Sequence, residues 1–363
     1  MTQPLRVALL GYGLAGRVFH APLVEAEPGL TLDAVVTRDP ERVAQLRADR
    51  PDVTVLDNAD AVWSAADAYD LVVVATGNAD HVPAAQAALD AGLHVVVDKP
   101  LAGTADEARS LIDLAARRNR QLHVFQNRRW DSDVLTVQRL VADGVLGRVH
   151  RLESRFERWR PVPQGGWREE GAPDQLPGLL YDLGAHLVDQ ALLLLGPARS
   201  VYAVARSVRR PDGPDDDTQV VLGHTSGAVS VLWASAVSAF TTPRMRVLGT
   251  TGGYQVDALD GQEEALRAGG DPSAPNWGAV PDYQWGTLVS RGADGRDSAA
   301  VVPSQPGAWP RYYAGVAGAI AGDGPPPVDP LDVVADLRVI EAAAASAATG
   351  QVHHLDPPAG HGS

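Results

Sequence analysis

Cysteine is absent from the chain, and lysine occurs once, at Lys99. The absence of cysteine excludes a disulfide framework and any metal site built on thiolates. Lysine and arginine together number 31, so 30 of these basic residues are arginine. Arginine stays charged and presents a planar fork, whereas lysine is a compact charge whose pKa changes readily on desolvation. The position that keeps the only lysine is therefore a candidate for chemistry, with a chance occurrence on a surface turn as the alternative.

Positive charge and long apolar runs are also scarce. The formal net charge of −14 argues against nucleic acid or an anionic membrane surface as a general partner, although it is compatible with a local basic pocket. No basic segment followed by an apolar stretch begins the chain, and no run approaches the length of a membrane span. We therefore expect a cytoplasmic protein, and 363 residues are enough for two domains.

The first 126 residues alternate short β-branched runs with helical patterns, which is typical of βαβ units around a parallel sheet. Several runs are apolar at every position, as strands buried on both faces should be. Thr104 and Glu107 form a capping box that predicts the start of a helix. The predicted strands are 6–11, 32–37, 53–56, 71–76, 94–98 and 121–125, and helices are predicted at 81–92 and 104–120.

The pattern changes after residue 126, where strand candidates are separated by turn signals. We expect residues 127–363 to form an α/β domain with an open, mainly antiparallel sheet and helices on one side. We expect the last helices of the chain to pack back on the first domain. Helices are predicted at about 132–143, 178–196, 309–322 and 330–350, and strands at 148–159, 200–208, 218–224, 228–236 and 244–249. The segment 257–308 receives no assignment, and 353–363 resembles a loose tail.

Three glycines, Gly11, Gly13 and Gly16, follow the first predicted strand in G-x-G-x-x-G spacing and open a helical segment. In this context the first glycine allows a tight turn, the second lets the backbone approach a diphosphate, and the third lets helix and strand pack closely. The diphosphate would lie at the helix N-terminus, beside Leu14 and Ala15. The alternative is a tight turn without a ligand. We expect a Rossmann domain, residues 1–126, with a doubly wound parallel sheet.

The end of the second predicted strand bears on which dinucleotide binds. An NAD site usually places an acid there to bond the ribose 2′-hydroxyl, whereas an NADP site places an arginine near a 2′-phosphate. Thr37 and Arg38 stand at this tip, and a hydroxyl beside a guanidinium suits a phosphate. Asp39 is one residue further and can still reach a ribose hydroxyl. We therefore favour NADP, with NAD as the alternative.

Two other strand ends reach the same edge of the sheet, where ligands of open α/β folds bind. The strand 71–76 leads into Gly77, Asn78 and His81, and helix capping is the structural alternative for Asn78 and His81. The strand 94–98 delivers Asp98 and Lys99, with a proline at 100 that keeps Lys99 extended. A lysine held there can stabilise oxyanion charge on a hydroxyl beside a nicotinamide ring.

Asp182 and His186 are four residues apart on a predicted helix and so share one face. A carboxylate and an imidazole one turn apart can form an acid/base pair, because histidine titrates near neutrality. A structural histidine at a domain interface is the alternative. Asp189 continues this face, with a capping role or exposure to solvent as equal alternatives. No third residue at metal-ligand spacing accompanies them, so we predict no metal.

Tryptophan and arginine gather in the Gly/Pro-rich loop "RWRPVPQGGWRE". Such a cluster is typical of a surface that stacks on and hydrogen-bonds a sugar, although an oligomer contact would use the same residue types. The residues concerned are Arg158, Trp159, Arg160, Trp167 and Arg168.

Taken together, "GYGLAGRVFHAPL", "ATGNADH", "DKPLAGTADEA", "QNRRWD", "RWRPVPQGGWRE", "YDLGAHLVDQ" and "DGQEEALRAG" resemble the glucose–fructose oxidoreductase/inositol dehydrogenase (Gfo/Idh/MocA) family over residues 5–350. The likeness is nearest to NADP-dependent scyllo-inositol dehydrogenases. It implies that Lys99 is the lysine of the family's E-K-P motif and that Asp182 and His186 are its catalytic pair. Asp98 is a departure, because the family commonly has Glu there. The resemblance also implies a homodimer or homotetramer that associates through the open sheet.

The expected function is an NADP-preferring oxidoreductase that acts on a secondary hydroxyl of a cyclic polyol or sugar. His186 would take the proton, Lys99 would stabilise the alkoxide and Asp182 would orient substrate and imidazole. The rivals are a non-catalytic dinucleotide-binding sensor of the same fold and an enzyme acting on an imine or a tetrapyrrole. Expected cofactor contacts are Gly11, Gly13, Leu14, Ala15, Gly16, Thr37, Arg38, Thr76, Gly77, Asn78, His81, Asp98, Lys99, Trp167 and Arg168. Expected substrate contacts are Lys99, Arg128, Trp159, Asp182 and His186.

Overall fold

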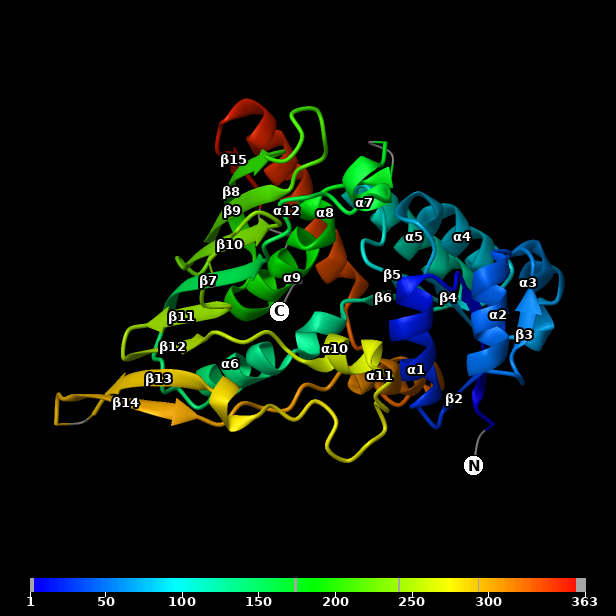
Figure 1. Cartoon of the computed structure of the whole chain (residues 1–363), viewed down its shortest axis with the longest axis horizontal. Helices are drawn as coiled ribbons and strands as arrows, with labels where there is room; N and C mark the ends of the chain where they lie inside the picture. The colour runs from blue at the N-terminus through cyan, green and yellow to red at the C-terminus, as the bar shows by residue number, and fades with distance from the viewer. Residues whose placement is uncertain (1–2, 173–174, 241, 293, 357–363) are drawn as a thin grey trace. The chain divides into compact units, whose positions relative to one another are not determined.

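The computed structural model describes residues 3–172, 175–240, 242–292 and 294–356 and divides into two compact units. The first unit comprises Met1–Asn127, Gln262–Trp277 and Ala308–Val334. The second unit comprises Arg128–Gly261, Gly278–Gly307 and Ala335–Ser363. Each unit is built around a sheet of its own (Figure 1).

The sheet of the first unit has six strands, all paired in parallel, in the order β3-β2-β1-β4-β5-β6. The strand order reverses between β1 and β4, which is the point where ligands of doubly wound sheets bind, beyond the carboxyl ends of the strands. The strands are β1 (Leu5–Leu10), β2 (Leu30–Val36), β3 (Thr54–Leu56), β4 (Leu71–Val74), β5 (His94–Asp98) and β6 (Leu122–Phe125).

Helices cover both faces of this sheet, and β4 and β6 are buried at every position, as their apolar sequences predict (Figure 1). The capping box of Thr104 and Glu107 is present at the start of α5. Helix α4 begins at Asn78 rather than at residue 81, because Gly77 is the extended residue that precedes it. The helices are η1 (a π-helix, Ala15–His20), α1 (Ala21–Glu25), α2 (Pro40–Asp49), α3 (Asp60–Ser64), α4 (Asn78–Asp90) and α5 (Ala105–Arg118).

Segments from late in the chain complete the core of the first unit. Helix α10 (Gln262–Arg267) and helix α11 (Pro310–Ala321) belong to it. Trp309, Tyr312 and Tyr313 are fully buried, and the ring of Tyr312 lies edge-on to Phe125 of β6, with centroids 4.9 Å apart. Aromatic pairs of this geometry add to the stabilisation that burial of their surface gives.

The sheet of the second unit is mixed and mainly antiparallel, as expected, in the order β14-β13-β12-β11-β7-β10-β9-β8-β15. Strands β7 and β10 pair in parallel. The strands are β7 (Val149–Glu157), β8 (Ala198–Arg206), β9 (Asp217–His224), β10 (Val229–Ser235), β11 (Met245–Gly249), β12 (Gly252–Val256), β13 (Gly286–Arg291), β14 (Asp297–Val302) and β15 (His353–His354).

The two faces of this sheet differ. Leu152, Leu222 and Leu232 are buried on the face against which the helices α8 and α9 pack. The pairing register places four exposed apolar side chains on the opposite face, namely Tyr202, Val229, Val289 and Val301. The helices with residues in this unit are α6 (Ser132–Ala142), α7 (Trp167–Glu170), α8 (Leu179–Asp182), α9 (Gly184–Leu195) and α12 (Pro330–Thr349).

Three sequence expectations need correction or completion. The helix predicted at 178–196 is two helices, α8 and α9, with the break at Leu183 beside Gly184, and glycine weakens a helix interior. Strand β12 was not predicted, and the unassigned segment 257–308 contains α10, the 3-10 turn η5 (Asp282–Gln284), β13 and β14. The expected tail begins with β15, and its residues 357–363 lie outside the described residues.

Within the described ranges, no helix combines the length and the apolar character needed to cross a bilayer.

Candidate active site

The glycine turn after β1 shows a different constraint at each glycine. Gly11 has a φ of +96°, and a Cβ added there would lie 2.6 Å from the carbonyl oxygen of Ala75. A Cβ added at Gly16 would lie 2.0 Å from the carbonyl oxygen of Gly11. At Gly13 the nearest atoms belong to the Arg42 guanidinium, at 3.8 Å. The fold therefore requires glycine at 11 and 16, whereas glycine at 13 fits the close approach of a ligand to the backbone.

The residues after Gly13 begin the helical segment that an anion would meet. Leu14 is exposed and precedes η1, and Ala15 is its first residue. The N–H of Arg17 donates to the carbonyl of Gly13 at 2.9 Å, which closes the first turn. Backbone N–H groups before that turn point outward at the N-terminus, where a diphosphate is stabilised.

Of the charged side chains just after β2, one caps a helix and two are exposed. The Oδ1 atom of Asp39 accepts the N–H groups of Glu41 and Arg42, at 3.0 and 3.1 Å, and so caps α2. Arg38 and Arg42 are exposed, and Thr37 is buried with its N–H bonded to Leu56. Sequence reasoning missed Arg42, although it lies four residues after Arg38.

The turn after β4 presents small polar groups. Thr76 has a buried hydroxyl for which the described residues supply no hydrogen-bond partner. Gly77 is extended and precedes α4, so Asn78 is the first residue of the helix and not its cap. His81 is buried, and its Nδ1 lies 2.7 Å from the carbonyl oxygen of Pro100. Burial lowers the pKa of His81.

The turn after β5 carries the single lysine. The Oδ1 atom of Asp98 accepts the N–H of Lys99 at 2.8 Å, and the Lys99–Pro100 peptide bond is cis. Burial acts to raise the pKa of Asp98, but His20 and Lys99 outweigh it and the pKa lies below its ordinary value. The nearest imidazole nitrogen of His20 lies 3.9 Å from Asp98 Oδ2. Lys99 itself is half-buried.

In the second unit, the predicted acid/base pair straddles the junction of α8 and α9. Asp182 is the last residue of α8, His186 is the third of α9, and Leu183 between the helices stays right-handed helical. Residues four apart therefore remain on one side. Asp182 is half-buried and His186 is 6% exposed.

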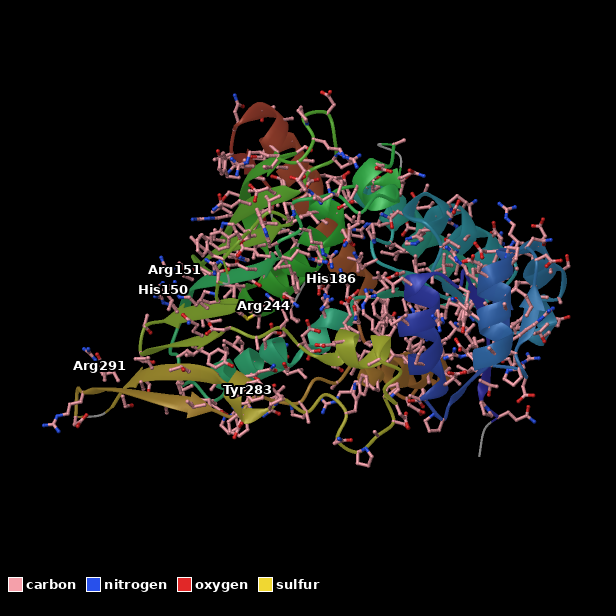
Figure 2. All side chains as sticks on the ribbon, viewed as in Figure 1. His150, Arg151, His186, Arg244, Tyr283 and Arg291 are labelled. Carbon is pink, nitrogen blue, oxygen red and sulfur yellow. The ribbon has the colours of Figure 1, made fainter. Side chains whose placement is uncertain are left out.

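The middle of α9 is fixed by two arginines. Asp189 is buried and binds Arg129 with distances of 2.6 to 3.0 Å, so the expectation that it meets solvent is wrong. Gln190 accepts a hydrogen bond from Arg244 at 2.9 Å, and Arg244 pairs with Asp133 at 2.9 Å. Arg244 and His186 lie on the helix-covered side of the sheet (Figure 2).

Phe156 of β7 lies between two guanidinium groups. Arg244 is 4.1 Å and Arg128 is 5.1 Å from the centre of its ring. Arg128 also approaches Asp131, at 3.4 Å. The expected substrate residue Arg128 is thus held against a core aromatic ring, which fixes the direction of its side chain.

The first residues of the Trp/Arg loop extend the pairing of β7 with the end of β10. Arg158 and Arg160 donate backbone N–H groups to Ser235 and Ala236, at 2.9 and 2.7 Å. Trp159 is 57% exposed. The side chains of Trp167 and Arg168 lie outside the described part of the chain, so their expected cofactor contacts stay predictions.

Three residues of the connection between β8 and β9 anchor this region, and the sequence predicts only a turn for them. Arg209 pairs with Glu169 of α7 and with Asp216, both at 2.8 Å. The Oδ2 atom of Asp215 accepts the N–H of Leu180 at 2.8 Å and so caps α8, the helix that ends at Asp182. Burial raises the pKa of Asp215.

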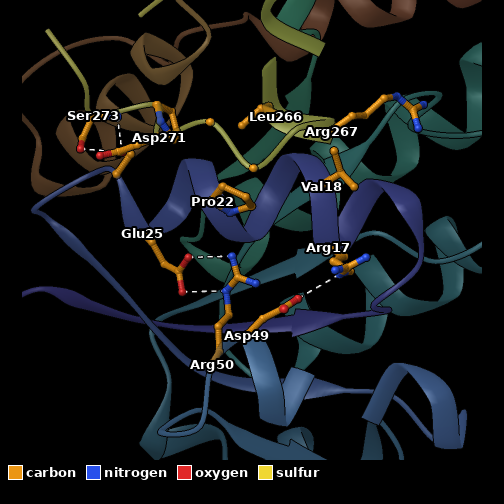
Figure 3. Close-up of a pocket in the computed structure, with 14 residues that line it drawn as sticks. Arg17, Val18, Pro22, Glu25, Asp49, Arg50, Leu266, Arg267, Asp271 and Ser273 are labelled. Carbon is orange, nitrogen blue, oxygen red and sulfur yellow. Dashed lines mark hydrogen bonds and ion pairs between the residues drawn. The ribbon is translucent and has the colours of Figure 1, made fainter. Parts of the chain in front are cut away.

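A cavity of about 460 Å³ is lined entirely by residues of the first unit (Figure 3). It is bordered by η1, α1, the end of α2 and the segment 266–273. Four of its charged side chains pair with one another, because Arg17 binds Asp49 at 2.9 Å and Arg50 binds Glu25 at 2.7 Å. The cavity contains none of the predicted catalytic residues.

Known proteins match both parts of the chain. The family described as "Oxidoreductase family, NAD-binding Rossmann fold" matches residues 5–126, and the "GFO/IDH/MocA C-terminal domain" matches residues 134–255. The uncharacterized oxidoreductase YdgJ of Escherichia coli is 38% identical over 341 residues, which cover 94% of this chain and 96% of that protein.

Two further matches, a curated relative and a solved structure, are from Bacillus subtilis. The scyllo-inositol 2-dehydrogenase (NADP(+)) IolW is 33% identical over 341 residues, covering 93% of this chain and 92% of that protein. The solved structure of yvaA has a TM-score of 0.92 at 32% identity and covers 98% of this chain and 99% of its own. The resemblance stated from the motifs is confirmed. The chain belongs to the Gfo/Idh/MocA family of oxidoreductases and carries that family's NAD-binding Rossmann fold in its first part.

Proposed function

We propose that the protein is an NADP-preferring dehydrogenase that interconverts a secondary alcohol and a ketone on a cyclic polyol or sugar. The substrate class is supported by relatives whose names specify such compounds, among them the scyllo-inositol 2-dehydrogenase IolW and a D-glucoside 3-dehydrogenase of Escherichia coli, 31% identical over 196 residues. Scyllo-inositol is the first candidate, because IolW matches nearly the whole chain.

The observation that carries the cofactor preference is the role of Asp39. Its carboxylate oxygen Oδ1 accepts two backbone N–H groups and caps α2, so one of the two oxygens that would bond a ribose 2′-hydroxyl is used by the fold. Arg38 and Arg42 are both exposed at this tip, and Arg42 lies beside Gly13. Two guanidinium groups suit a 2′-phosphate better than a neutral ribose.

The reaction assigns a separate task to each catalytic side chain. His186 accepts the proton of the substrate hydroxyl as the carbonyl forms and returns it in the reverse direction. Lys99 stabilises the negative charge that develops on that oxygen. Asp182, one helical turn before His186, orients the imidazole and a neighbouring substrate hydroxyl. The bound nicotinamide supplies the hydride acceptor or donor.

Arg128, Trp159, Trp167 and Arg168 are proposed to line the substrate and cofactor sites. The indole ring of tryptophan can stack on a polyhydroxylated ring, and the guanidinium of arginine can form hydrogen bonds with its hydroxyl groups. Trp159 is exposed enough to stack on a ligand.

The protein is further proposed to be a cytoplasmic homodimer or homotetramer that associates through the open face of the second sheet. That face carries the exposed apolar side chains Tyr202, Val229, Val289 and Val301. Between them lie charged residues, including Glu153 and Arg151, which pair at 3.3 Å. Exposed apolar side chains rimmed by charge are typical of association surfaces. Light scattering of the purified protein measures the assembly directly.

The decisive experiment measures initial rates with NADP⁺ and with NAD⁺ on scyllo-inositol, other inositols, glucose and anhydro-sugars, followed by nicotinamide absorbance. We expect turnover with at least one cyclic polyol and a higher kcat/KM with NADP⁺. Nucleotide binding without turnover on any substrate would instead favour the non-catalytic sensor. A higher kcat/KM with NAD⁺ would refute the cofactor preference alone.

A further inference from the structure

His20, the last residue of η1, is a buried imidazole to which the sequence assigns no role. Its Nδ1 atom lies 2.7 Å from the hydroxyl of Tyr313, on α11, and its Nε2 atom lies 3.9 Å from Asp98 Oδ2. The ring packs against Phe125, with centroids 4.3 Å apart. One imidazole thus connects the helix after the glycine turn, the end of β5 and a helix from late in the chain.

The contacts continue from Asp98 into the lysine turn. Oδ2 of Asp98 faces His20, while Oδ1 accepts the backbone N–H of Lys99 at 2.8 Å. On the other side of the turn, His81 Nδ1 lies 2.7 Å from the carbonyl oxygen of Pro100. Buried imidazoles therefore bracket Lys99, one through the residue before it and one through the residue after it.

The groups around His20 determine where its proton lies. A carboxylate has no proton to donate, so the nitrogen of His20 that faces Asp98, at 3.9 Å and beyond hydrogen-bond distance, is best used as an N–H. The other nitrogen, Nδ1, then accepts the proton of the Tyr313 hydroxyl. The titratable groups that face His20 are Asp98 and Tyr313. Tyr312 packs against Tyr313, with ring centroids 5.2 Å apart.

The charge of Asp98 needs such a partner. Only 18% of its side chain is exposed, and a carboxylate removed from water is costly unless other groups pair with it. The imidazole of His20, held by the fully buried Tyr313, places its N–H side toward Asp98 Oδ2 and so favours one orientation of the carboxylate electrostatically. That orientation in turn sets the Lys99 N–H and the start of its side chain.

We propose that His20 and Tyr313 are positioning residues that act through Asp98 to hold Lys99 at the end of β5. This inference rests on the proposed function, because the task of Lys99 in the reaction is part of that proposal. Neither His20 nor Tyr313 is proposed to contact substrate. Their effect is on the placement of the amine.

The single lysine gives a probe that needs no substrate. Protein grown with lysine labelled with ¹³C at Cε contains one labelled side chain, Lys99, and so gives one signal. Its chemical shift in the native protein is compared with its shift after unfolding in urea. In His20→Asn and in Tyr313→Phe we expect this signal to move toward the unfolded position.

Variants of His20 separate its two contacts. Asparagine keeps a polar atom near Nδ1 but is too short for Asp98, whereas glutamine can place an amide N–H near the Nε2 position. We expect His20→Asn to lower kcat by about 10- to 100-fold, since displacement of a catalytic group by about 1 Å has effects of this size. His20→Gln should recover part of the loss. The KM for NADPH should change little in all of them, because uniform binding is unaffected.

The control is His123→Leu, which removes another buried imidazole of the first unit. It should leave the Lys99 signal and kcat unchanged, so a general effect of losing a buried histidine is separated from the positioning effect. Tyr313→Phe removes one oxygen and keeps the aromatic packing, and it decides the matter if His20→Asn fails to fold.

The outcomes distinguish this inference from the proposed function. The positioning role is overturned if the Lys99 signal and kcat both stay at wild-type values in His20→Asn. It is also overturned if both stay at wild-type values in Tyr313→Phe and His20→Gln together. A displaced signal with unchanged kcat would also overturn it. Absence of polyol turnover in the wild type, with the signal displaced in the variants, would refute the proposed function and leave the link from His20 to Lys99 standing.

Discussion

Replacement of the buried His123 by leucine tests how burial of a histidine makes the stability of the first unit depend on pH. His123 lies on β6 and is 1% exposed. Within the described residues, neither ring nitrogen has a hydrogen-bond partner. Burial, aided by the charge of His94, lowers the pKa of His123 from 6.5 to about 3. The folded protein therefore keeps this imidazole neutral where an unfolded chain protonates it.

The sign and size of the effect follow from linkage. Because the folded pKa is below the unfolded one, the unfolded state binds the proton first, and stability is lost as pH falls from 6.5 toward 3. At pH 5 the protonation of His123 in the unfolded chain lowers the free energy of unfolding by about 2 kcal/mol, from 1.5 pH units at about 1.36 kcal/mol each. At pH 7.5 the same contribution is close to zero.

Urea unfolding followed by tryptophan fluorescence at pH 7.5, 6 and 5 measures this contribution. We expect His123→Leu to be at least as stable as wild type at pH 7.5, because it removes two buried polar atoms. Its advantage should grow by about 2 kcal/mol at pH 5. Burial also lowers the pKa of His81, His94 and His224, which are present in both proteins. The contributions of His81 and His224 cancel in the comparison, whereas His94 enters through its interaction with His123.

The control is the same substitution at His150, which is exposed at the start of β7 (Figure 2). It should not change the dependence of stability on pH. If the difference between His123→Leu and wild type is the same at pH 5 as at pH 7.5, His123 is protonated in the folded state and the reasoning from burial is wrong.

Three further predictions concern the cofactor and the catalytic lysine. Lys99→Arg keeps the charge but changes its shape, so kcat should fall at least about 100-fold with the KM for NADP⁺ little altered, and near-normal initial rates would contradict the assigned role. Replacing both Arg38 and Arg42 with alanine should raise the KM for NADP⁺ about 10- to 100-fold, since charge-assisted hydrogen bonds to the 2′-phosphate are lost, and should leave the KM for NAD⁺ within a few-fold. Equal effects on both nucleotides would argue against a phosphate contact. Gly13→Ala should weaken nucleotide binding in a titration without lowering the melting temperature, whereas Gly16→Ala should lower the melting temperature because its Cβ would meet a backbone oxygen at 2.0 Å; unchanged binding in the first variant would refute a close approach at Gly13.

The sequence predicts the first unit well because its signals are local. Apolar runs mark the buried parallel strands, the glycine turn follows β1 directly, and the capping box at Thr104 marks the start of α5. Each of these features depends on residues close together in the chain. The same holds for the pair Asp182 and His186, whose spacing alone places them on one side.

Other features depend on partners distant in sequence and leave little local signal. Strands β13 and β14 are largely exposed and exist because they pair with each other and with β12. Such strands have sequences set by their surroundings rather than by an intrinsic preference. The link between Asp189 and Arg129 joins residues 60 positions apart, so the local sequence leaves exposure of Asp189 to solvent open as an alternative, and the structure excludes it.

The late aromatic residues in the core of the first unit have a consequence for how the protein is made. The contact between His20 and Tyr313 spans 293 positions, and Trp309 and Tyr312 are buried in the same core. The nascent N-terminal part therefore leaves the ribosome with apolar surface that no residue yet synthesised can cover. Contacts of such long sequence separation slow folding and prolong exposure to aggregation. Demand for chaperones during synthesis should accordingly end only when translation has passed α11.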